Sequence, residues 1–342
     1  ARAASNPWLQ YSEFFTNKSF LIPDTIAFSR ILPYFQTLPN FSSRFKISFV
    51  ELVGYEAYFV EQWISSRSCN SLIVTYTGDR KNKIIAYHVL SLAAGMDLKS
   101  SVPGNDLNDE GKVEVTDNWP PKFISYLVDQ LESPFCVATE TSLGYAFITN
   151  LTQLNPFLSL INAKTGNIAD DYLLFTVNYN FRKVGCGSRS AATTDEPTKS
   201  MEDKFKSAFK IDGKIPINYA ALNLISIMQT FLHYYGLLDP LYCDGLFCEK
   251  TEAAIDEWWA LVLDIPLAVQ LIKMKPPSCS LPDSIQAIIG FTVLCRYLLE
   301  VGGNNFSAPK DPMDFKKMKP SIQKFQKHFR VKESSTFDHV TL

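Results

Sequence analysis

Two different patterns of apolar residues divide this 342-residue sequence, and a polar interval lies between them. Before the interval, β-branched and aromatic runs are typical of strands, whereas after it apolar residues recur at the three- and four-residue spacing of helices. The interval, at residues 187–200, is rich in small polar residues and shows neither period. We therefore predict an α+β domain at residues 1–186, a linker at 187–200 and an all-α second half.

The clearest strand signals lie between residues 45 and 92. Segment 45–60 (FKISFVELVGYEAYFV) puts Phe45, Ile47 and Phe49 on one side of an extended chain, and Gly54 can supply a bulge or turn before the second aromatic stretch. Segment 71–92 has two β-branched and aromatic runs on either side of a polar turn that begins at Gly78-Asp79, a pattern that predicts a hairpin. The polar stretch 95–118 has neither period and predicts a loop. Antiparallel strands are thus expected in the first half.

The second half contains five periodic segments that predict helices. Ser200 and Asn218 are the expected N-caps of the first two, since small polar side chains accept hydrogen bonds from the first free N–H groups of a helix. We divide this half into a helical unit at 201–275 and a second helical unit with a tail at 276–342. The five predicted helices lie near residues 200–213, 218–236, 249–262, 282–302 and 312–329.

Charge and hydropathy exclude two classes of partner. The formal net charge of -2 opposes nucleic-acid binding by bulk electrostatics, which needs a basic surplus. The Lys and Arg residues between 316 and 332 are interpreted as a solvated helix face, with a phosphate-binding stripe as the alternative. The longest apolar stretch, 220–238, contains polar residues and predicts a core helix. We therefore expect neither direct nucleic-acid binding nor membrane insertion; the oligomeric state stays open.

Cysteine usage and the absence of catalytic motifs favour a non-enzymatic intracellular protein. Seven scattered cysteines and a first segment without a basic-then-apolar leader suit a reducing compartment. Cys243 and Cys248 lack a complementary ligand pair at zinc-site spacing. The sequence also lacks a glycine-rich phosphate loop and a recognisable nucleophile setting. We therefore predict no catalytic residue, no metal and no cofactor.

The candidate structural or partner-binding residues lie in YGLLDPLYCDGLFCEKTEAAIDEWW, residues 235–259. The Asp244-Gly245 pair predicts a turn in which Gly245 takes a positive φ and Asp244 bonds the backbone. Thr251 lies near the start of the next helix. Trp258 and Trp259 point about 100° apart on a helix. We expect at least one indole in the core, and the other either in the core or exposed as a partner-binding anchor.

The pattern over residues 224–259, which includes this stretch, resembles the peptidoglycan-binding-domain-like fold, a helical repeat. Two positions depart from that family's pattern: Cys248 stands where glycine is usual, and Trp258-Trp259 replaces Phe-Gln. A weaker second unit spans 281–329, where IQKFQK restores the Phe-Gln ending. The resemblance implies one or two three-helix units, which can serve only as a scaffold. The matching residues are Gly236, Asp244, Gly245, Phe247, Thr251, Ala254 and Ile255.

The wider chain resembles a fungal protein family named for binding the Sin-three corepressor scaffold, the Stb type. The resemblance rests on FVELVGYEAYFVEQWISSRSCNSLIVTYTGD, NFRKVGCGSRS, IPINYA, DGLFCEKTEAAIDEWW and KDPMDF…FQK. It implies a scaffold protein that binds a Sin-type histone-deacetylase transcriptional corepressor and a nuclear or nucleocytoplasmic location. The alternatives are a carbohydrate-binding or cell-wall hydrolase-associated protein, suggested by the helical repeat and four Asn-x-Ser/Thr sequons, and an enzyme with an unfamiliar site in the α+β half.

Overall fold

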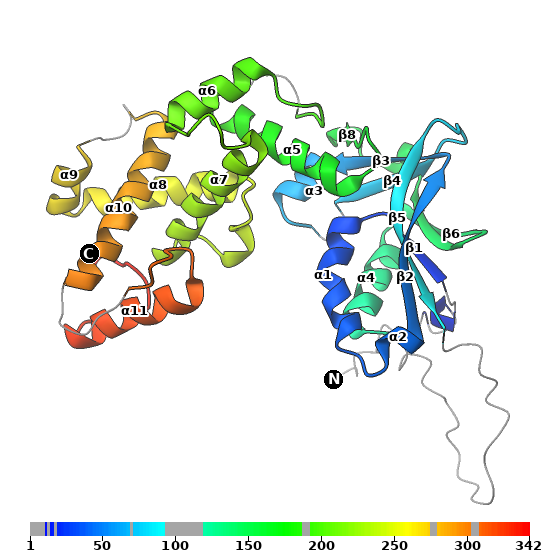
Figure 1. The fold of residues 1–342 in the computed structure, drawn as a ribbon, viewed down its shortest axis with the longest axis horizontal. Coiled ribbons are helices and arrows are strands. Elements are labelled where there is room, and N and C mark those ends of the chain that lie inside the picture. The colour runs from blue at the N-terminus through cyan, green and yellow to red at the C-terminus, as the bar shows by residue number, and fades with distance from the viewer. Residues whose placement is uncertain are drawn as a thin grey trace, which may run out of the picture. The chain divides into compact units, whose positions relative to one another are not determined.

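The computed structural model describes residues 11, 14–16, 19–68, 71–92, 119–186, 192–273, 279–301 and 308–342. The chain forms two compact units. Unit 1 comprises Ala1–Ile64 and Ser68–Tyr172, and unit 2 comprises Ser65–Arg67 and Leu173–Leu342. The α+β class predicted from the sequence is confirmed, because the strands lie in unit 1 and helices make up unit 2 (Figure 1).

The border between the units lies inside α5 (Ile168–Lys183), a helix that the sequence analysis does not identify. The predicted linker at 187–200 follows this helix, and its residues 187–191 lie outside the described part of the chain. Residues 192–198 are described and have no helix or strand. The division at 187–200 therefore stays a prediction.

Unit 1 contains two sheets and a layer of helices. The five-stranded sheet has the order β2-β5-β1-β7-β6, in which only β1 and β7 run parallel, and the three-stranded sheet has the order β4-β3-β8. Helices α1 and α4 cover one face of the larger sheet (Figure 1). The strands are β1 (Ser19–Ile22), β2 (Phe45–Val53), β3 (Tyr55–Val60), β4 (Leu72–Tyr76), β5 (Lys83–Ser91), β6 (Cys136–Thr141), β7 (Gly144–Thr149) and β8 (Leu160–Asn162). The helices and 3₁₀ turns are η2 (Phe14–Thr16), α1 (Thr25–Gln36), α2 (Phe41–Arg44), α3 (Glu61–Ser65), α4 (Pro121–Glu132) and η5 (Leu151–Gln153).

The hairpin predicted within 71–92 is wrong, because β4 and β5 do not pair. β5 pairs with β2 along nine residues and β4 pairs with β3 along five, so 45–60 and 72–91 together form one long antiparallel pair that bends in the middle. At the bend, Gly54 has φ +90° and its carbonyl accepts the N–H groups of Thr77 and Gly78. The bend sends the two halves of the pair into different sheets. The predicted loop at 95–118 lies outside the described residues.

The core between the large sheet and its helices is aromatic. Phe123 of α4 lies 5.1 Å from Phe35 and 5.9 Å from Phe28, both of α1, measured between ring centroids. Trp119 packs 5.4 Å from Phe20 of β1, and Phe20 is fully buried. The tilted and edge-on geometries are those that aromatic pairs prefer. Burial of these rings fixes α1 and α4 on the sheet.

Helix α1 begins at Asp24, a buried N-cap. Its carboxylate accepts the Ala27 N–H at 2.8 Å. Burial raises the pKa of Asp24 from 3.8 to about 6, although the hydrogen bond and the charge of Arg30 act in the opposite direction. Because the folded-state pKa lies above the unfolded one, this carboxyl's contribution to stability is present at acidic pH and is lost as the pH rises through about 6.

We therefore expect Asp24→Asn to stabilise unit 1 at neutral pH by about 1–2 kcal/mol, since asparagine caps helices well and carries no charge to bury. The gain should disappear as the pH falls to the ordinary aspartate pKa of 3.8, where the carboxyl is protonated in the folded state. Urea unfolding of the parent and the variant across this pH range measures it. The exposed Asp79→Asn variant is the control, and an Asp24→Asn gain that does not change with pH would contradict the assignment.

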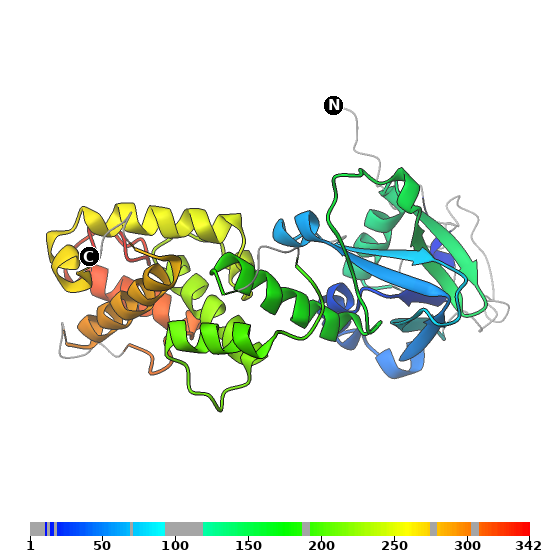
Figure 2. The ribbon, with the colours of Figure 1, turned by 90° about the horizontal axis from the view of Figure 1, so that it is seen from above.

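Unit 2 consists of helices that share one core. Its elements are α6 (Lys199–Phe209), α7 (Ile217–Tyr234), η6 (Pro240–Tyr242), α8 (Glu249–Leu263), α9 (Pro266–Ile272), α10 (Leu281–Val301) and α11 (Phe315–His328), preceded by the second half of α5. α10 packs against α6, α7, α9 and α11 (Figure 2). Buried side chains from both predicted helical units, 201–275 and 276–342, lie in the same cluster. No helix among the described residues is long and apolar enough to cross a membrane.

The two predicted N-caps are corrected. α6 is capped by Thr198, which follows Pro197, has an extended backbone and accepts the Met201 N–H. α7 begins directly after Pro216, and Asn218 lies within its first turn with its side-chain oxygen buried and unpaired. In both cases a proline lies just before the helix, Pro197 before the N-cap of α6 and Pro216 at the N-cap position of α7.

Candidate functional site

The Asp244-Gly245 turn connects η6 to α8 and lies directly on α7. Gly245 has φ +87°, a conformation that costs a side-chain-bearing residue about 1–2 kcal/mol. A β-carbon at this position would lie 2.9 Å from the Leu222 carbonyl oxygen of α7. Both the backbone conformation and the close approach to α7 therefore require glycine here.

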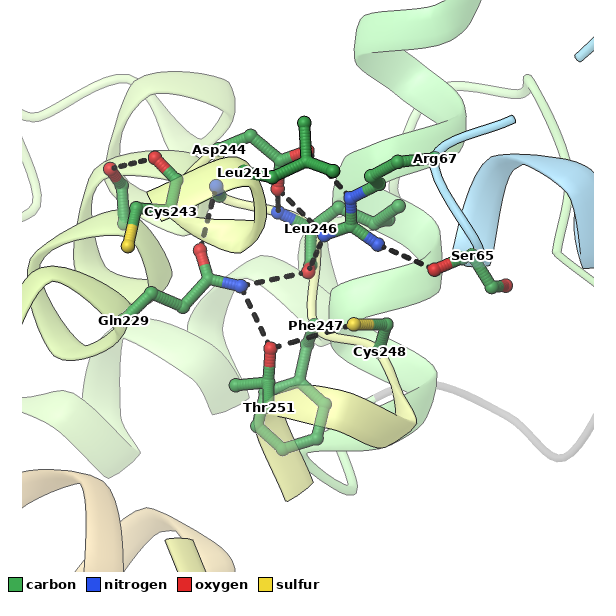
Figure 3. A network of polar contacts seen from close by, with 12 residues as sticks. Ser65, Arg67, Gln229, Leu241, Cys243, Asp244, Leu246, Phe247, Cys248 and Thr251 are labelled. Carbon is green, nitrogen blue, oxygen red and sulfur yellow. Dashed lines mark hydrogen bonds and ion pairs between the residues drawn. The ribbon is translucent and has the colours of Figure 1, made fainter. Parts of the chain in front are cut away.

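Asp244 is held by an arginine from far away in the sequence. Arg67 donates two hydrogen bonds to the Asp244 carboxylate, at 2.8 and 2.7 Å, and a third to the Leu246 carbonyl at 2.9 Å (Figure 3). Its side chain is nearly buried and its guanidinium lies 5.0 Å from the Tyr242 ring. Burial alone would lower the pKa of Arg67, but the hydrogen bonds and charge of Asp244 raise it. The forked geometry makes this a strong pair.

Two buried amide side chains bind the backbone of the turn. Gln229 of α7 accepts the Gly245 N–H at 2.9 Å and donates to the Leu246 carbonyl at 2.9 Å. Asn180 of α5 donates to the Gly245 carbonyl at 2.7 Å and accepts the Phe247 N–H at 2.9 Å. Because unpaired backbone groups are costly when buried, these amides allow the turn to lie in the interior.

Unlike Asp244, which is exposed, the remaining sequence-predicted residues are buried. Thr251 is fully buried, and its hydroxyl accepts a 2.9 Å hydrogen bond from Gln229 (Figure 3). Trp258 is 0% exposed and Trp259 4% exposed, and the Trp259 N–H donates to Ser284 of α10. The structure therefore brings Asp244, Gly245 and Thr251 into one network and places both indoles in the core, so neither indole is an exposed anchor.

The chemistry available at this turn is structural. The donors and acceptors around it are used within the network, which we call the turn network: Arg67, Asn180, Gln229, Asp244, Gly245 and Thr251. Burial, with the charges of Asp244 and Asp239, raises the pKa of Cys243 to about 12, so this thiol stays protonated near neutral pH. Among the described residues, no group of His, Cys, Asp or Glu side chains is arranged to hold a metal ion.

Sequence reasoning missed three members of the turn network, Arg67, Asn180 and Gln229. Gln229 gave a signal, because it is a polar residue within the apolar stretch 220–238 and is fully buried. A polar side chain in such a place needs a partner. Arg67 and Asn180 gave no comparable signal, since nothing in their local sequence indicates what they contact.

A second feature, the outer edge of the large sheet, offers unused hydrogen-bonding groups. The bonds from Gly54 N to Asn82 O and from Leu92 N to Arg44 O bracket the ladder between β2 and β5. Along an antiparallel pair, residues that hydrogen-bond to the neighbouring strand alternate with residues that do not. The backbone N–H and C=O groups of the even-numbered residues of β2 therefore hydrogen-bond to β5. The N–H and C=O groups of Ile47, Phe49, Glu51 and Val53 consequently point outward, and no described residue hydrogen-bonds to them.

This edge of β2 also carries exposed apolar side chains. Phe49 is 60% exposed although its ring lies 4.3 Å from that of Tyr87, and Val53 is exposed as well. The strand is nine residues long and contains no proline. Long edge strands with exposed apolar side chains can pair with another strand, and the exposed Lys46 and Glu51 are the two charged residues of β2 that oppose such pairing. The edge of β2 is therefore the candidate binding surface of unit 1.

Comparison with known proteins identifies relatives of the chain. A family described as "STB6-like, N-terminal domain" matches residues 18–102 and 110–184. Protein STB2 of Saccharomyces cerevisiae is 27% identical over 90% of this chain and 36% of its own length. Protein STB6 of the same organism is 23% identical over 89% of this chain and 42% of its own length. The chain thus spans about two fifths of the length of these curated relatives.

No solved structure matches the chain. The family match ends at residue 184, so the peptidoglycan-binding-like segment at 224–259 lies outside it. That resemblance stays a prediction, as does any role in carbohydrate binding.

Proposed function

We propose, from the premise that this chain belongs to the Stb-type family, that it is a non-enzymatic interaction module whose partner is a Sin-type corepressor scaffold. The family resemblance implies that partner. The single structural observation that supports a protein partner is the open edge of β2, which lies within the family-matched residues. An extended segment that adds a strand there would bond the outward-pointing N–H and C=O groups of Ile47, Phe49 and Glu51, to which no described residue hydrogen-bonds.

The proposal gives each unit a different task. Unit 1 presents the edge of β2, where backbone bonds supply affinity and the exposed Phe49 ring supplies an apolar contact. Unit 2 holds its helices through the turn network, whose buried polar groups are bonded within the unit. We further propose that the chain acts in the nucleus or shuttles to it, as the same resemblance implies.

Affinity purification of the full chain at native abundance, with partners identified by mass spectrometry, tests this function. We expect the parent chain to recover a Sin-type scaffold and Phe49→Lys to recover less than about a tenth as much, because a charge on an edge strand opposes pairing. Val137→Lys is the matched control, since Val137 is 59% exposed on β6, the opposite edge of the same sheet.

The two parts of the proposal fail separately. Recovery of other proteins but no Sin-type scaffold with the parent chain would reject the corepressor association. Equal recovery with Phe49→Lys and the parent would leave the association standing and reject the edge of β2 as its site.

A further inference from the structure

An apolar pocket opens in unit 2 between α9, α10, α11 and the C-terminal segment. Its volume is about 620 Å³, including the open mouth. Buried side chains form the floor, among them Phe291, Cys295 and Leu299 of α10. Leu271 of α9 and Leu298 of α10 line it and are still 47% and 48% exposed. The pocket therefore has a closed apolar floor and a rim of exposed leucines.

The rim continues along the outer side of α10. Leu294 and Leu298 are four residues apart, so they lie on one face of the helix, and both line the pocket. Val293 and Tyr297, one position before each of them, are about half exposed. Clustered exposed apolar side chains of this kind mark interaction sites more often than scattered ones do.

The pocket itself offers an incoming group little polar contact. Its one hydroxyl side chain, Thr341, donates to Asp338 at 2.6 Å and accepts from Gln326 at 2.7 Å, so its bonding is already used. Burial raises the pKa of Cys295 to about 12, so its thiol is neutral. The part of a ligand that enters this pocket is therefore apolar.

The helix beside the pocket is strongly basic. Phe325 of α11 lines the pocket, and the exposed side chains of Lys324 and His328 lie about 100° and about 60° around the helix from it, on the same side. The segment 315–332 contains no Asp or Glu. Among the described residues no carboxylate forms an ion pair with Lys324 or Lys327, whereas Lys317 pairs with Asp314 at 2.9 Å. The cations of this segment are Lys316, Lys317, Lys319, Lys324, Lys327, Arg330 and Lys332.

We propose that this pocket and the basic side of α11 bind an acidic amphipathic helix of a protein partner. Large apolar side chains on one face of such a helix fit the pocket and the α10 rim, and its carboxylates lie against Lys324. The charge on α11 selects the occupant, since a neutral or basic helix with the same apolar face would lack complementary charges. The inference deepens the proposed function and rests on it, because it takes the chain to be a protein-binding module.

Fluorescence anisotropy with the full chain and a synthetic peptide tests the surface. The probe is a labelled helix of about 16 residues with Leu and Phe at positions i, i+3, i+4 and i+7 and mostly Glu on its other faces. We expect saturable binding that weakens as salt rises. A peptide of the same composition in permuted order should bind at least about tenfold more weakly, and so should the same helix with Lys in place of Glu.

Three variants locate the site. Leu298→Asp should weaken binding at least about tenfold, because it puts a charge at the apolar rim while leaving the buried floor unchanged. Lys324→Glu should weaken it about tenfold. Lys316→Glu is the matched control, since it lies eight residues before Lys324, about 12 Å along the helix, and should have little effect.

Several results would overturn the inference. These are equal binding of the permuted peptide, unchanged binding by Leu298→Asp in a variant whose circular dichroism matches the parent, and an equal loss in all charge variants. A dimer in sedimentation that Leu298→Asp dissociates would assign the pocket to a second copy of the chain. Flotation with phosphatidylserine vesicles without peptide binding would assign α11 to a membrane surface. Since the assay contains no corepressor, its failure leaves the proposed association with a Sin-type scaffold untouched.

Discussion

Replacing Trp258 with alanine should lower the free energy of unfolding of unit 2 by about 3–5 kcal/mol, the range for removing a large aromatic side chain from a core. Trp258 is 0% exposed. Its ring lies 5.0 Å from that of Trp259, 6.1 Å from Phe291 of α10 and 6.2 Å from Tyr235, measured between centroids. Its removal would leave a cavity where α7, α8 and α10 meet.

A loss of this size is comparable to the whole stability of a marginal domain. We therefore expect the variant to be largely unfolded in unit 2 at 37 °C while unit 1 keeps its structure. Hydrogen exchange of the amides of α7 and α8, compared with those of β5, measures the two units separately. Protection in α8 equal to that of the parent would show that the core tolerates the cavity.

Trp258→Phe is an informative companion to this variant. Among the described residues the buried Trp258 N–H has no partner with full hydrogen-bond geometry, although it interacts with the Tyr235 hydroxyl, so phenylalanine removes a poorly satisfied donor along with part of the ring. The expected loss is about 1 kcal/mol or less, since the two effects oppose each other. The same change at Trp259 breaks its hydrogen bond to Ser284 and should cost more.

The sequence predicted those features that depend on local spacing. The helices near 249–262 and 282–302 correspond closely to α8 and α10, because a 3.6-residue apolar period is visible within a single segment. The strands β2 and β5 were also predictable from their own segments, because β-branched and aromatic runs are a local signal of strands. Their pairing was not, because a strand carries no local mark of its partner. The turn residues at Gly78-Asp79 suggested that β4 and β5, which are consecutive in the sequence, form a hairpin. Instead β5 pairs with β2 over nine residue pairs.

The residues of the turn network were likewise predictable only in part. Asp244 and Gly245 were predictable, because turn chemistry needs their residue types at adjacent positions. Their partners were not, since Arg67 lies 177 residues from Asp244, and Asn180 lies 65 residues from Gly245. The burial of Trp259 likewise depends on a separate helix. This is α10, which begins at Leu281 and accepts the Trp259 N–H at the hydroxyl of Ser284.

Gly245→Ala is the second substitution with a large expected effect, a loss of about 2–4 kcal/mol from unit 2. Two causes add. The alanine backbone would be strained at φ +87°. Its β-carbon would also lie 2.9 Å from the Leu222 carbonyl oxygen, a backbone atom of α7 that cannot rotate away. Moving the turn outward to relieve this contact would lengthen the hydrogen bonds that Gln229 and Asn180 make to it.

Two other glycines of the same unit separate these causes. Gly185 has φ +80° and open space around its missing side chain, so Gly185→Ala should cost only the backbone strain, about 1 kcal/mol. Gly213 has open space and no positive φ, so Gly213→Ala should change stability by less than about 0.5 kcal/mol. Denaturant unfolding followed by the fluorescence of the unit 2 tryptophans measures all three. If Gly245→Ala costs no more than Gly185→Ala, the turn does not depend on its close approach to α7, and the turn network is not what fixes α8 in place.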